Sequence, residues 1–244
     1  MPNSSPTDAD PGLLDNPLWH ALTGPHRRFA VASGDDSDTA GAYRYRVDVA
    51  PFAALRDVAD SAAWRELAGL CGPKGRAALE APAVIAAPQG WTVDTLFPVA
   101  QMIAPTDGLT TDGAPAPVVP LSKKDAAEMM ALAELTHPGP FAASTVELGG
   151  YLGVRREGRL VAMAGRRLHL PGWIEISAVC THPDHRGQGL SRLLIAGVET
   201  AIRREGHRAF LHVLHENTRA IDIYRGLGFT TRADMTMTVV RSMS

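Results

Sequence analysis

Hydrophobic and polar positions in the second half of the chain follow two periods, one typical of strands and one typical of helices. Apolar or alternating runs predict strands at 118–121, 151–155, 159–169, 173–181, 209–213 and 230–240, the last being a strand or a pair. Apolar stripes at helical spacing predict helices at 122–135, 189–205 and 217–227. The predicted order is therefore β-α-β-β-β-α-β-α-β.

The first half of the chain carries a weaker pattern. Residues 28–33 and 43–50 have strand periodicity on either side of a turn-rich segment, which predicts a hairpin. A helix is predicted at 59–70, and two further strands are predicted at 83–87 and 92–103. These elements predict a smaller α/β unit in which no chemical motif stands out.

Residues 105–117, PTDGLTTDGAPAP, interrupt the pattern with Gly, Pro, Thr and Asp and predict a linker. The linker separates an N-terminal α/β domain at 16–104, which follows a flexible polar tail at 1–15, from a second domain at 118–244. The predicted fold class is therefore α/β, with strands and helices mixed as in α+β proteins.

Composition narrows the function classes. The 24 basic and 26 acidic residues nearly balance, so nucleic acid is not an expected partner. The two cysteines, Cys71 and Cys180, have no paired spacing, which argues against a disulfide framework or a metal site and favours a reducing compartment. Neither a signal pattern nor an apolar run of membrane-spanning length is present. We expect a soluble cytoplasmic protein without a membrane partner.

The most informative segment is 180–194, CTHPDHRGQGLSRLL, which joins a predicted strand directly to a predicted helix. Amides in the first turn of a helix have no intrahelical acceptor and can bind a phosphate. Gly187 and Gly189 let the backbone approach a ligand closely, and Arg186 adds a permanent cation. The segment therefore predicts a pyrophosphate site.

The glycine spacing identifies the kind of pyrophosphate. A dinucleotide motif starting at Gly187 would need a glycine where Arg192 stands, and a Walker lysine is missing. The pattern Arg-x-x-Gly-x-Gly/Ala fits Arg186, Gly189 and Ser191, with serine in the last place. Here the sequence resembles the GNAT superfamily of acyl-CoA-dependent N-acyltransferases, in which this loop binds the pyrophosphate of CoA. The preceding residues His182, Pro183 and Asp184 resemble that family as well.

A second motif, NTRAIDIYRGLGF, occupies 217–229 and has helical spacing. From these residues alone, Tyr224 is either a core aromatic or a functional group. The family resemblance implies that its hydroxyl lies near the CoA sulfur and protonates the departing thiolate. The resemblance also assigns cofactor contacts along the strand, the loop and this helix: Val179, Cys180, Thr181, Arg186, Gly187, Gln188, Gly189, Leu190, Ser191, Arg192, Asn217 and Tyr224.

The resemblance covers residues 117–242 and implies the GNAT fold, a mostly antiparallel mixed sheet with splayed central strands flanked by helices. Strand periodicity puts Ile174, Ile176, Ala178 and Cys180 on one apolar face, and Glu175 on the other. Several family members hold a carboxylate at the place of Glu175 that draws the proton from the amine through water. The alternative is a surface or salt-bridged glutamate.

Other candidates carry less weight. The substitutes for Glu175 are His169, His212 and His215, each of which also fits an ordinary loop or sheet histidine. Cys180 lies on the apolar face and is not expected to be a nucleophile, while His182 and His185 are expected to shape the loop.

The leading prediction is an N-acetyltransferase that moves an acetyl group from acetyl-CoA to a primary amine of a small molecule or peptide by direct attack in a ternary complex. The sequence EISAVCTHPDHRGQG resembles the branch related to glycine N-acyltransferases and their bacterial relatives. Segments 136–141 and 232–237 are expected to line the acceptor site, and no metal is expected. The N-terminal half is hypothesised to be a degenerate GNAT-like unit.

Alternatives remain open: a catalytically inactive CoA-binding regulatory or interaction protein, a transferase with a longer acyl donor, or an oxygen acceptor. A homodimer is one option for the assembly. The acceptor is not identified by any charge pattern in the sequence.

Overall fold

An eight-stranded sheet is formed from both halves of the chain in the computed structural model, which describes residues 9–33, 39–109 and 116–243. Its strand order is β4-β11-β5-β10-β9-β8-β7-β6. The strands are β4 (Arg76–Ala81), β5 (Trp91–Ile103), β6 (Val119–Pro120), β7 (Leu152–Arg156), β8 (Arg159–Leu170), β9 (Trp173–Thr181), β10 (Arg208–Leu214) and β11 (Thr230–Ser242). Every neighbouring pair is antiparallel except the parallel pair β9 and β10. The predicted mixed, mostly antiparallel sheet is confirmed.

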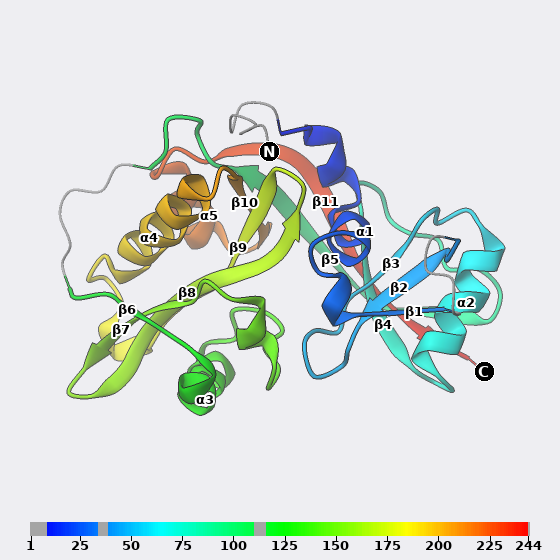
Figure 1. The fold of residues 1–244 in the computed structure, drawn as a ribbon, viewed down its shortest axis with the longest axis horizontal. Coiled ribbons are helices and arrows are strands. Elements are labelled where there is room, and N and C mark those ends of the chain that lie inside the picture. Colours follow the sequence, from blue (N-terminus) through cyan, green and yellow to red (C-terminus); the bar gives the residue numbers. More distant parts are fainter. Residues whose placement is uncertain (1–8, 34–38, 110–115, 244) are drawn as a thin grey trace.

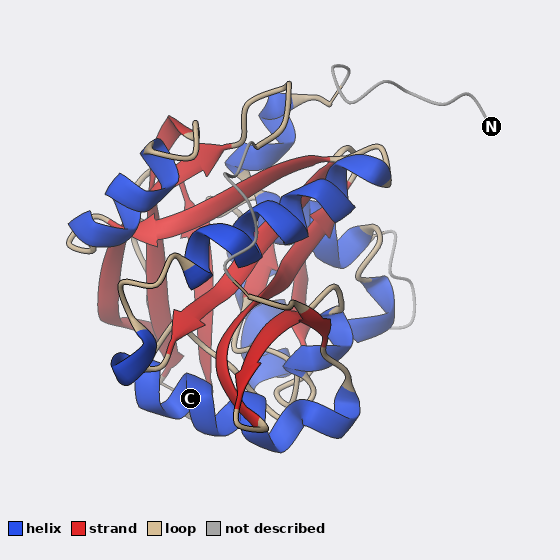
Figure 2. Cartoon of the chain, turned by 90° about the vertical axis from the view of Figure 1, so that its left-hand side faces the viewer, coloured by secondary structure: helices blue, strands red, loops and turns tan. Residues whose placement is uncertain are grey.

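Helices cover both faces of the sheet (Figures 1 and 2). α4 (Leu190–Arg204) and α5 (Thr218–Arg225) pack on one face, where Leu194 and Ile202 are fully buried against strand residues such as Ile174. α3 (Ala126–Thr136) packs on the other face through Met129. Ser122 and Asp125 form a capping box just before α3, at the start of the helix predicted at 122–135.

The N-terminal residues form a separate three-stranded sheet, β1 (Ala30–Ala32), β2 (Ala42–Tyr45) and β3 (Ala53–Leu55). It packs with α1 (Pro17–Thr23) and α2 (Ser61–Cys71), in blue and cyan in Figure 1. β1 and β2 pair antiparallel, which confirms the predicted hairpin, although β2 ends before residue 50. The degenerate GNAT-like origin of this unit stays a hypothesis.

The prediction of a strand at 83–87 is wrong. Residues 82–90 contain no strand, because Pro82 and Pro88 enclose a loop that Ile85 anchors in the core. The strand lies earlier, at β4, whose sequence RAALEA has no β-branched residue and is buried on both faces. A local pattern that depends on β-branched or alternating residues therefore misses it.

The strand β5 lies between β10 and β11, so the sheet continues across the boundary predicted at 105–117. Figure 1 shows β5 and β11 side by side, extending from the α4 and α5 side to the N-terminal unit. The division into two domains stays a prediction, but it does not coincide with a break in the sheet. Residues 110–115 of the predicted linker lie outside the described residues.

Residues 9–15, which the polar composition places in a flexible tail, pack against the sheet instead. They contain a short 3-10 helix, Pro11–Asp15, in which Leu14 is fully buried. The indole Nε1 of Trp173 donates to the carbonyl of Asp10 at 3.0 Å, and Arg232 forms an ion pair with Asp15 at 2.6 Å. The prediction of a flexible tail fails for these residues because Leu14 and, in part, Leu13 pack into the core and these contacts outweigh the polar sequence around them. Residues 1–8 lie outside the described residues.

A β-bulge interrupts β9 at Ala178, whose φ is +52°. Ser177 pairs with Gly165 and Cys180 with Met163, so two residues of β9 face one residue of β8. Ile174 and Ile176 consequently face α4, whereas Ala178 and Cys180 face α3. The prediction that these four residues share one face is wrong, because the bulge reverses the alternation.

Candidate functional site

The central strands β9 and β10 diverge after a short parallel contact. Only three residue pairs connect them, ending at Phe210 and Glu175. Beyond that point β10 continues along β5 and β9 continues along β8, so their facing edges separate. The splayed strands predicted from the family resemblance are therefore present.

A pocket of about 530 Å³ lies at this opening. One side is formed by Ser191 of α4, Tyr224 of α5 and strand residues that face these helices, such as Val179. The other side is formed by the opposite face of the sheet and the N-terminal unit, including Phe52, Ala78, Phe97 and Met237. Because His212 and its neighbour Val213 project to opposite faces and both line the pocket, it connects the two faces of the sheet.

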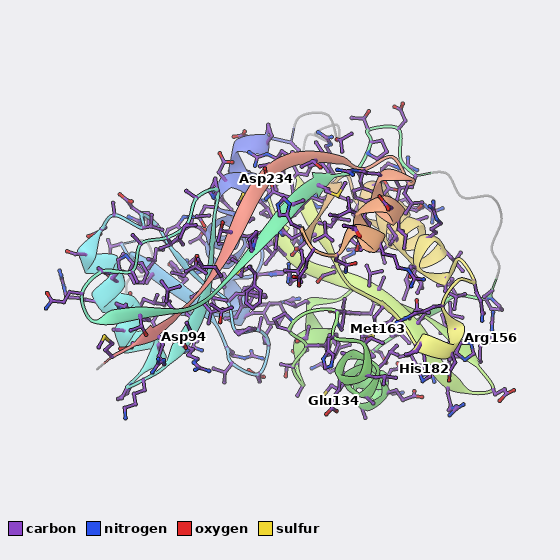
Figure 3. All side chains as sticks on the ribbon, turned by 180° about the vertical axis from the view of Figure 1, so that it is seen from behind. Asp94, Glu134, Arg156, Met163, His182 and Asp234 are labelled. Atoms are coloured by element: carbon purple, nitrogen blue, oxygen red, sulfur yellow. The ribbon has the colours of Figure 1, made fainter. Side chains whose placement is uncertain are left out.

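The loop before α4 has the backbone expected of an anion site. Gly187 and Gly189 have φ angles of +77° and +73°, and no atom would contact an added Cβ at either position. α4 begins directly after Gly189, so the amides of its first turn have no intrahelical acceptor. Arg186 Nε donates to the carbonyl of Thr181 at 3.4 Å, which keeps its cation beside the loop. Figure 3 shows His182 at this end of the sheet, far from Asp94 at the other end.

The other predicted cofactor contacts surround this loop. The hydroxyls of Thr181 and Ser191 are 3.1 Å apart, so serine in the last motif position links the strand to the helix. Arg192 Nη1 donates to the carbonyl of Gly226 at 3.3 Å and connects α4 to the end of α5. Leu190 is buried beneath the helix start, whereas Gln188 is exposed on the loop.

Tyr224 and Asn217 come from α5. Asn217 caps the helix by accepting a hydrogen bond from the amide of Ala220 at 3.2 Å, and both Asn217 and Tyr224 line the pocket. Among the described residues, no hydrogen-bond partner is recorded for the hydroxyl of Tyr224. Burial, followed by the charge of Glu175, raises the pKa of Tyr224 to about 12. Its hydroxyl is therefore protonated and available to a ligand.

Glu175 is neither on the surface nor at the pocket wall. Its carboxylate is fully buried and accepts hydrogen bonds from Arg167, with Nε at 2.7 Å and Nη2 closer still, and from His212 Nδ1 at 2.8 Å. Burial alone raises the pKa of Glu175, but the charge of Arg167 and these hydrogen bonds lower it to about 2. Arg167 and His212 line the pocket in front of it.

His212 lies between two carboxylates. Its Nε2 is 2.8 Å from Glu80 Oε1 on β4, opposite the contact of its Nδ1 with Glu175. Burial lowers the pKa of His212, but Glu80 and Glu175 together raise it to about 9. The imidazole is therefore a cation at neutral pH, and it is paired on both sides.

Sequence analysis missed Glu80 and Arg167. Each is a charged residue inside a mostly apolar strand, Glu80 in RAALEA and Arg167 in RLVAMAGRRLHL. Buried charges of this kind are costly unless they are paired, so a charge within a buried strand was the available signal. Which charges meet is decided by strand order, which the local pattern does not contain.

The remaining candidates lie elsewhere. His169 contacts the ring of His207, and burial lowers its pKa to about 4, while His215 pairs with the exposed Asp234 at 3.2 Å. Burial raises the pKa of the Cys180 thiol to about 11, which agrees with the expectation that it is not a nucleophile. His182 caps the short 3-10 helix of the loop through its Nδ1.

Of the segments expected at the acceptor site, residues 137–140 and Met237 line the pocket. In the part of the chain that the structure describes, no cluster of His, Cys, Asp and Glu side chains is suited to hold a metal ion. Within the same residues, no helix has the length and apolar character required to span a membrane.

Comparisons with known proteins agree with this geometry. A family model described as FR47-like protein matches residues 151–239. The chain is similar to a GNAT-family protein of Novosphingobium aromaticivorans, with 38% identity and a TM-score of 0.83 over 95% of this chain and 99% of that one. It also has the fold of a GCN5-related N-acetyltransferase from Kribbella flavida, with 21% identity and a TM-score of 0.64 over 93% of this chain and 94% of that one. No curated protein matches the chain.

Proposed function

Because this chain belongs to the GNAT family of acetyltransferases, we propose that it moves an acetyl group from acetyl-CoA to a primary amine of a small molecule or peptide. Membership of the family makes it an acyltransferase; the acetyl donor and the amine acceptor are the proposed parts. The observation that carries the proposal is the pocket between β9 and β10, which is lined by Tyr224 and by Ser191, in the first turn of α4 directly after the loop suited to pyrophosphate.

The residues present fit CoA. The amides after Gly189, together with Arg186, offer backbone donors and positive charge to the pyrophosphate. The edge of β9 that β10 leaves unpaired, around Val179, offers backbone groups to the pantetheine arm in the manner of an added strand. Acetyl-CoA supplies the activated thioester, and an amide on this edge can polarise its carbonyl oxygen.

Tyr224 is proposed as the acid. Its hydroxyl is protonated, lines the pocket and has no recorded competing partner among the described residues. It can donate its proton to the sulfur as the C–S bond breaks. Direct attack by the amine needs no covalent intermediate on the protein, which is consistent with a thiol at Cys180 that burial keeps protonated.

The role of proton acceptor predicted for Glu175 stays a prediction. We propose that Glu175 also holds Arg167 and His212 in place, because all three of its hydrogen bonds in the described structure go to these side chains. Replacing Glu175 by Gln would separate the two roles, since the amide keeps one acceptor oxygen but removes the charge.

The proposals for the family branch and the cellular compartment rest on the sequence. The segment EISAVCTHPDHRGQG supports placement in the branch related to glycine N-acyltransferases. Two free cysteines, Cys71 and Cys180, support a reducing compartment such as the cytoplasm. A homodimer stays a prediction.

Calorimetric titration of the purified protein with acetyl-CoA and with free CoA tests the proposal. Micromolar binding of acetyl-CoA, followed by amine-dependent release of free thiol, is the expected result. Failure of both ligands to bind would overturn it and favour an interaction protein. Binding without thiol release from any amine would favour the inactive CoA-binding alternative.

A further inference from the structure

The first half of β5 has a sheet neighbour on one edge only. β10 pairs with β5 at Val99–Ile103 and ends at Leu214, opposite Val99, whereas β11 follows β5 as far as Trp91. β5 therefore extends beyond the end of β10 toward the N-terminal unit (Figure 1). In the part of the chain that the structure describes, the only backbone hydrogen bonds of residues 92–97 are those to β11. The other edge of this segment is open.

The backbone of Leu96 is directed toward this open edge. The carbonyl of Pro98 accepts a hydrogen bond from the amide of His215, just after β10, at 3.1 Å, so Pro98 bonds on the β10 side. Successive residues of an antiparallel strand bond to alternate edges, and the register with β11 is regular between Leu96 and Pro98. The N–H and C=O of Leu96 consequently point away from β11, toward the side where a further strand would lie.

The open edge is accessible to another chain. Residues 95–98 are four consecutive exposed positions in a strand that is otherwise mostly buried or half-buried, with Leu96 41% and Phe97 40% exposed. Proteins usually protect such edges with lysine, proline or a covering element. Residues 92–97 contain neither lysine nor proline, and their one charged side chain, Asp94, is paired with arginines. This edge can therefore pair with an extended peptide.

The open edge leads to the mouth of the pocket. Phe97 and Leu214 both line the pocket and are exposed, and Val99 lines it between them and the sheet. A peptide that pairs with Leu96 antiparallel to β5 runs in the direction of β10, so its N-terminus lies at the pocket and its later residues lie along Thr92. The opposite direction would bring a C-terminus, which has no amine, to the pocket.

The charges of the pocket restrict the first residue of such a peptide. Among the described residues that line the pocket, none is Asp, Glu or Lys. The lining cations Arg76, Arg167 and His212 each have a carboxylate partner already. A charged side chain on the acceptor would therefore lack a counter-ion beside apolar walls such as Phe52 and Met237, which is costly. An apolar first residue fits this lining.

Resting on the proposed function, we infer that the acceptor is the N-terminal α-amine of a peptide or protein that begins with an apolar residue, and that the following residues pair with the open edge of β5 at Leu96. Main-chain hydrogen bonds along an added strand provide affinity, while the pocket selects the first side chain. A small amine can fill the pocket, but it leaves the edge of β5 unpaired.

The transfer balances with groups already described. The α-amine reacts as the neutral base, after its ammonium form has lost a proton to solvent. Its nitrogen bonds to the thioester carbon, and the C–S bond breaks with its electron pair remaining on sulfur. Tyr224 gives its proton to sulfur and receives one proton from the nitrogen. The products are an acetylated N-terminus and free CoA.

The test on wild type compares phenylalanine amide, the tetrapeptide amide Phe-Ala-Ala-Ala, and the same tetrapeptide with methyl groups on its alanine nitrogens. The tetrapeptide is expected to exceed phenylalanine amide about tenfold or more in kcat/KM, because only the longer chain can hydrogen-bond to Leu96. Methylation is expected to remove this gain, since it removes the backbone donors without shortening the chain. A tetrapeptide that begins with lysine instead is expected to be about tenfold poorer or worse.

The matched variants are Leu96→Pro and Leu96→Ala. Leu96→Pro removes an N–H that points to the open edge, and Pro98 already lacks one on the same side of β5. It is expected to lower kcat/KM about tenfold for the tetrapeptide, but to stay within about threefold for phenylalanine amide and within about twofold in acetyl-CoA affinity. Leu96→Ala keeps the N–H and is expected to change each of these quantities by less than about threefold.

Equal kcat/KM for the tetrapeptide and phenylalanine amide, or a gain that survives methylation or Leu96→Pro, would overturn the inference and leave acetyl transfer in place. The methylated peptide acts on wild type, so the test does not depend on the folding of a variant. A wild-type dimer that Leu96→Pro converts to a monomer in sedimentation would place a second copy on the edge and would also overturn it.

Absence of acetyl-CoA binding by wild type would instead overturn the proposed function. If wild type binds acetyl-CoA without turning over any acceptor, calorimetric binding of the tetrapeptide to the CoA complex must weaken about tenfold on methylation; otherwise the inference fails.

Discussion

At the scale of single residues, Tyr224 is the side chain whose surroundings most restrict its role. It is buried at the pocket, protonated, and without a recorded partner in the described part of the chain. A structural tyrosine in such a place usually donates its hydroxyl to a carbonyl. A tyrosine hydroxyl can donate to a ligand only if no protein group already accepts its proton, and Tyr224 meets this condition in the described part of the chain.

We expect Tyr224→Phe to lower kcat about 10- to 1,000-fold, because an acid that assists a leaving group typically contributes on this scale. The acetyl-CoA affinity should stay within about twofold, since only one oxygen is removed. Single-turnover kinetics and calorimetry measure the two quantities. An unchanged rate under conditions where chemistry limits turnover would remove Tyr224 from the role of acid.

The buried charges predict how stability depends on pH. The pKa of His212 is raised to about 9, so its contribution is complete below its ordinary 6.5 and is lost as pH rises toward 9. Burial lowers the pKa of His26 to about 3 and that of His169 to about 4, so stability also falls below pH 6.5 as these residues are protonated in the unfolded chain. The contribution of Glu175 is lost between pH 4.5 and about 2. Maximum stability is expected close to pH 6.5.

Urea unfolding at a series of pH values measures this curve. A decrease on the order of 1–3 kcal/mol in the free energy of unfolding is expected between pH 6.5 and 9. The variant His212→Gln should be less stable at pH 6.5 and should lose that alkaline decrease. A variant that keeps the full decrease would show that His212 is not its source.

Residues differ in how far the sequence predicts their roles. Tyr224, Gly189 and Arg186 lie in continuous motifs, so both their identity and their neighbourhood can be predicted. The partners of Glu175 are different, because Arg167 and His212 come from separate strands and Glu80 comes from the other half of the chain. Periodicity indicates on which face a residue lies, but not which strand stands beside it.

At the scale of elements, two local irregularities build the pocket. The bulge at Ala178 turns β9 so that Val179 faces α4 while Ala178 faces α3. The loop before α4 has Gly187 and Gly189 in the left-handed region. The loop could be predicted because glycine marks such a conformation. The bulge could not, because alanine at φ +52° has no sequence signal.

Gly189→Ala is expected to lower CoA affinity about tenfold or more, since an alanine there strains the backbone that presents the amides to the pyrophosphate. Gly158→Ala is the matched control: its φ is +80°, it likewise has no atom near an added Cβ, and it lies in the turn between β7 and β8. Both variants should lose about 1 kcal/mol of stability. Equal loss of CoA affinity in the two would contradict a specific role for the loop.

At the scale of the whole molecule, β5 connects the two halves. It pairs with β10 over Val99–Ile103 and with β11 over nearly its full length. The element order of the second half could be predicted almost completely. A strand at 92–103 could be predicted as well, but its place between β10 and β11 could not, because pairing between distant segments leaves no trace in either segment alone. The composition of 105–117 predicts a linker, yet it carries no information about which strands pair on its two sides.

We expect a fragment of residues 118–244 to be unfolded or insoluble, because removing β4 and β5 leaves β10 and β11 without the strand between them. Circular dichroism and calorimetry with CoA measure folding and binding. The full chain cleaved at 110–115 is the control and should keep both properties, since the strands remain present. A soluble 118–244 fragment that binds CoA would show that the second half folds independently.

The position of β11 has a consequence for how the protein is made. β4 ends at Ala81, and its one neighbour in the sheet, β11, begins only at Thr230 and lies between β4 and β5. Synthesis at about 5–20 residues per second therefore leaves β4 without its sheet neighbour until β11 has been made. A truncation that removes β11 would take out an interior strand of the sheet. Chaperones and proteases would then meet an open sheet, so such truncations should be among the most damaging.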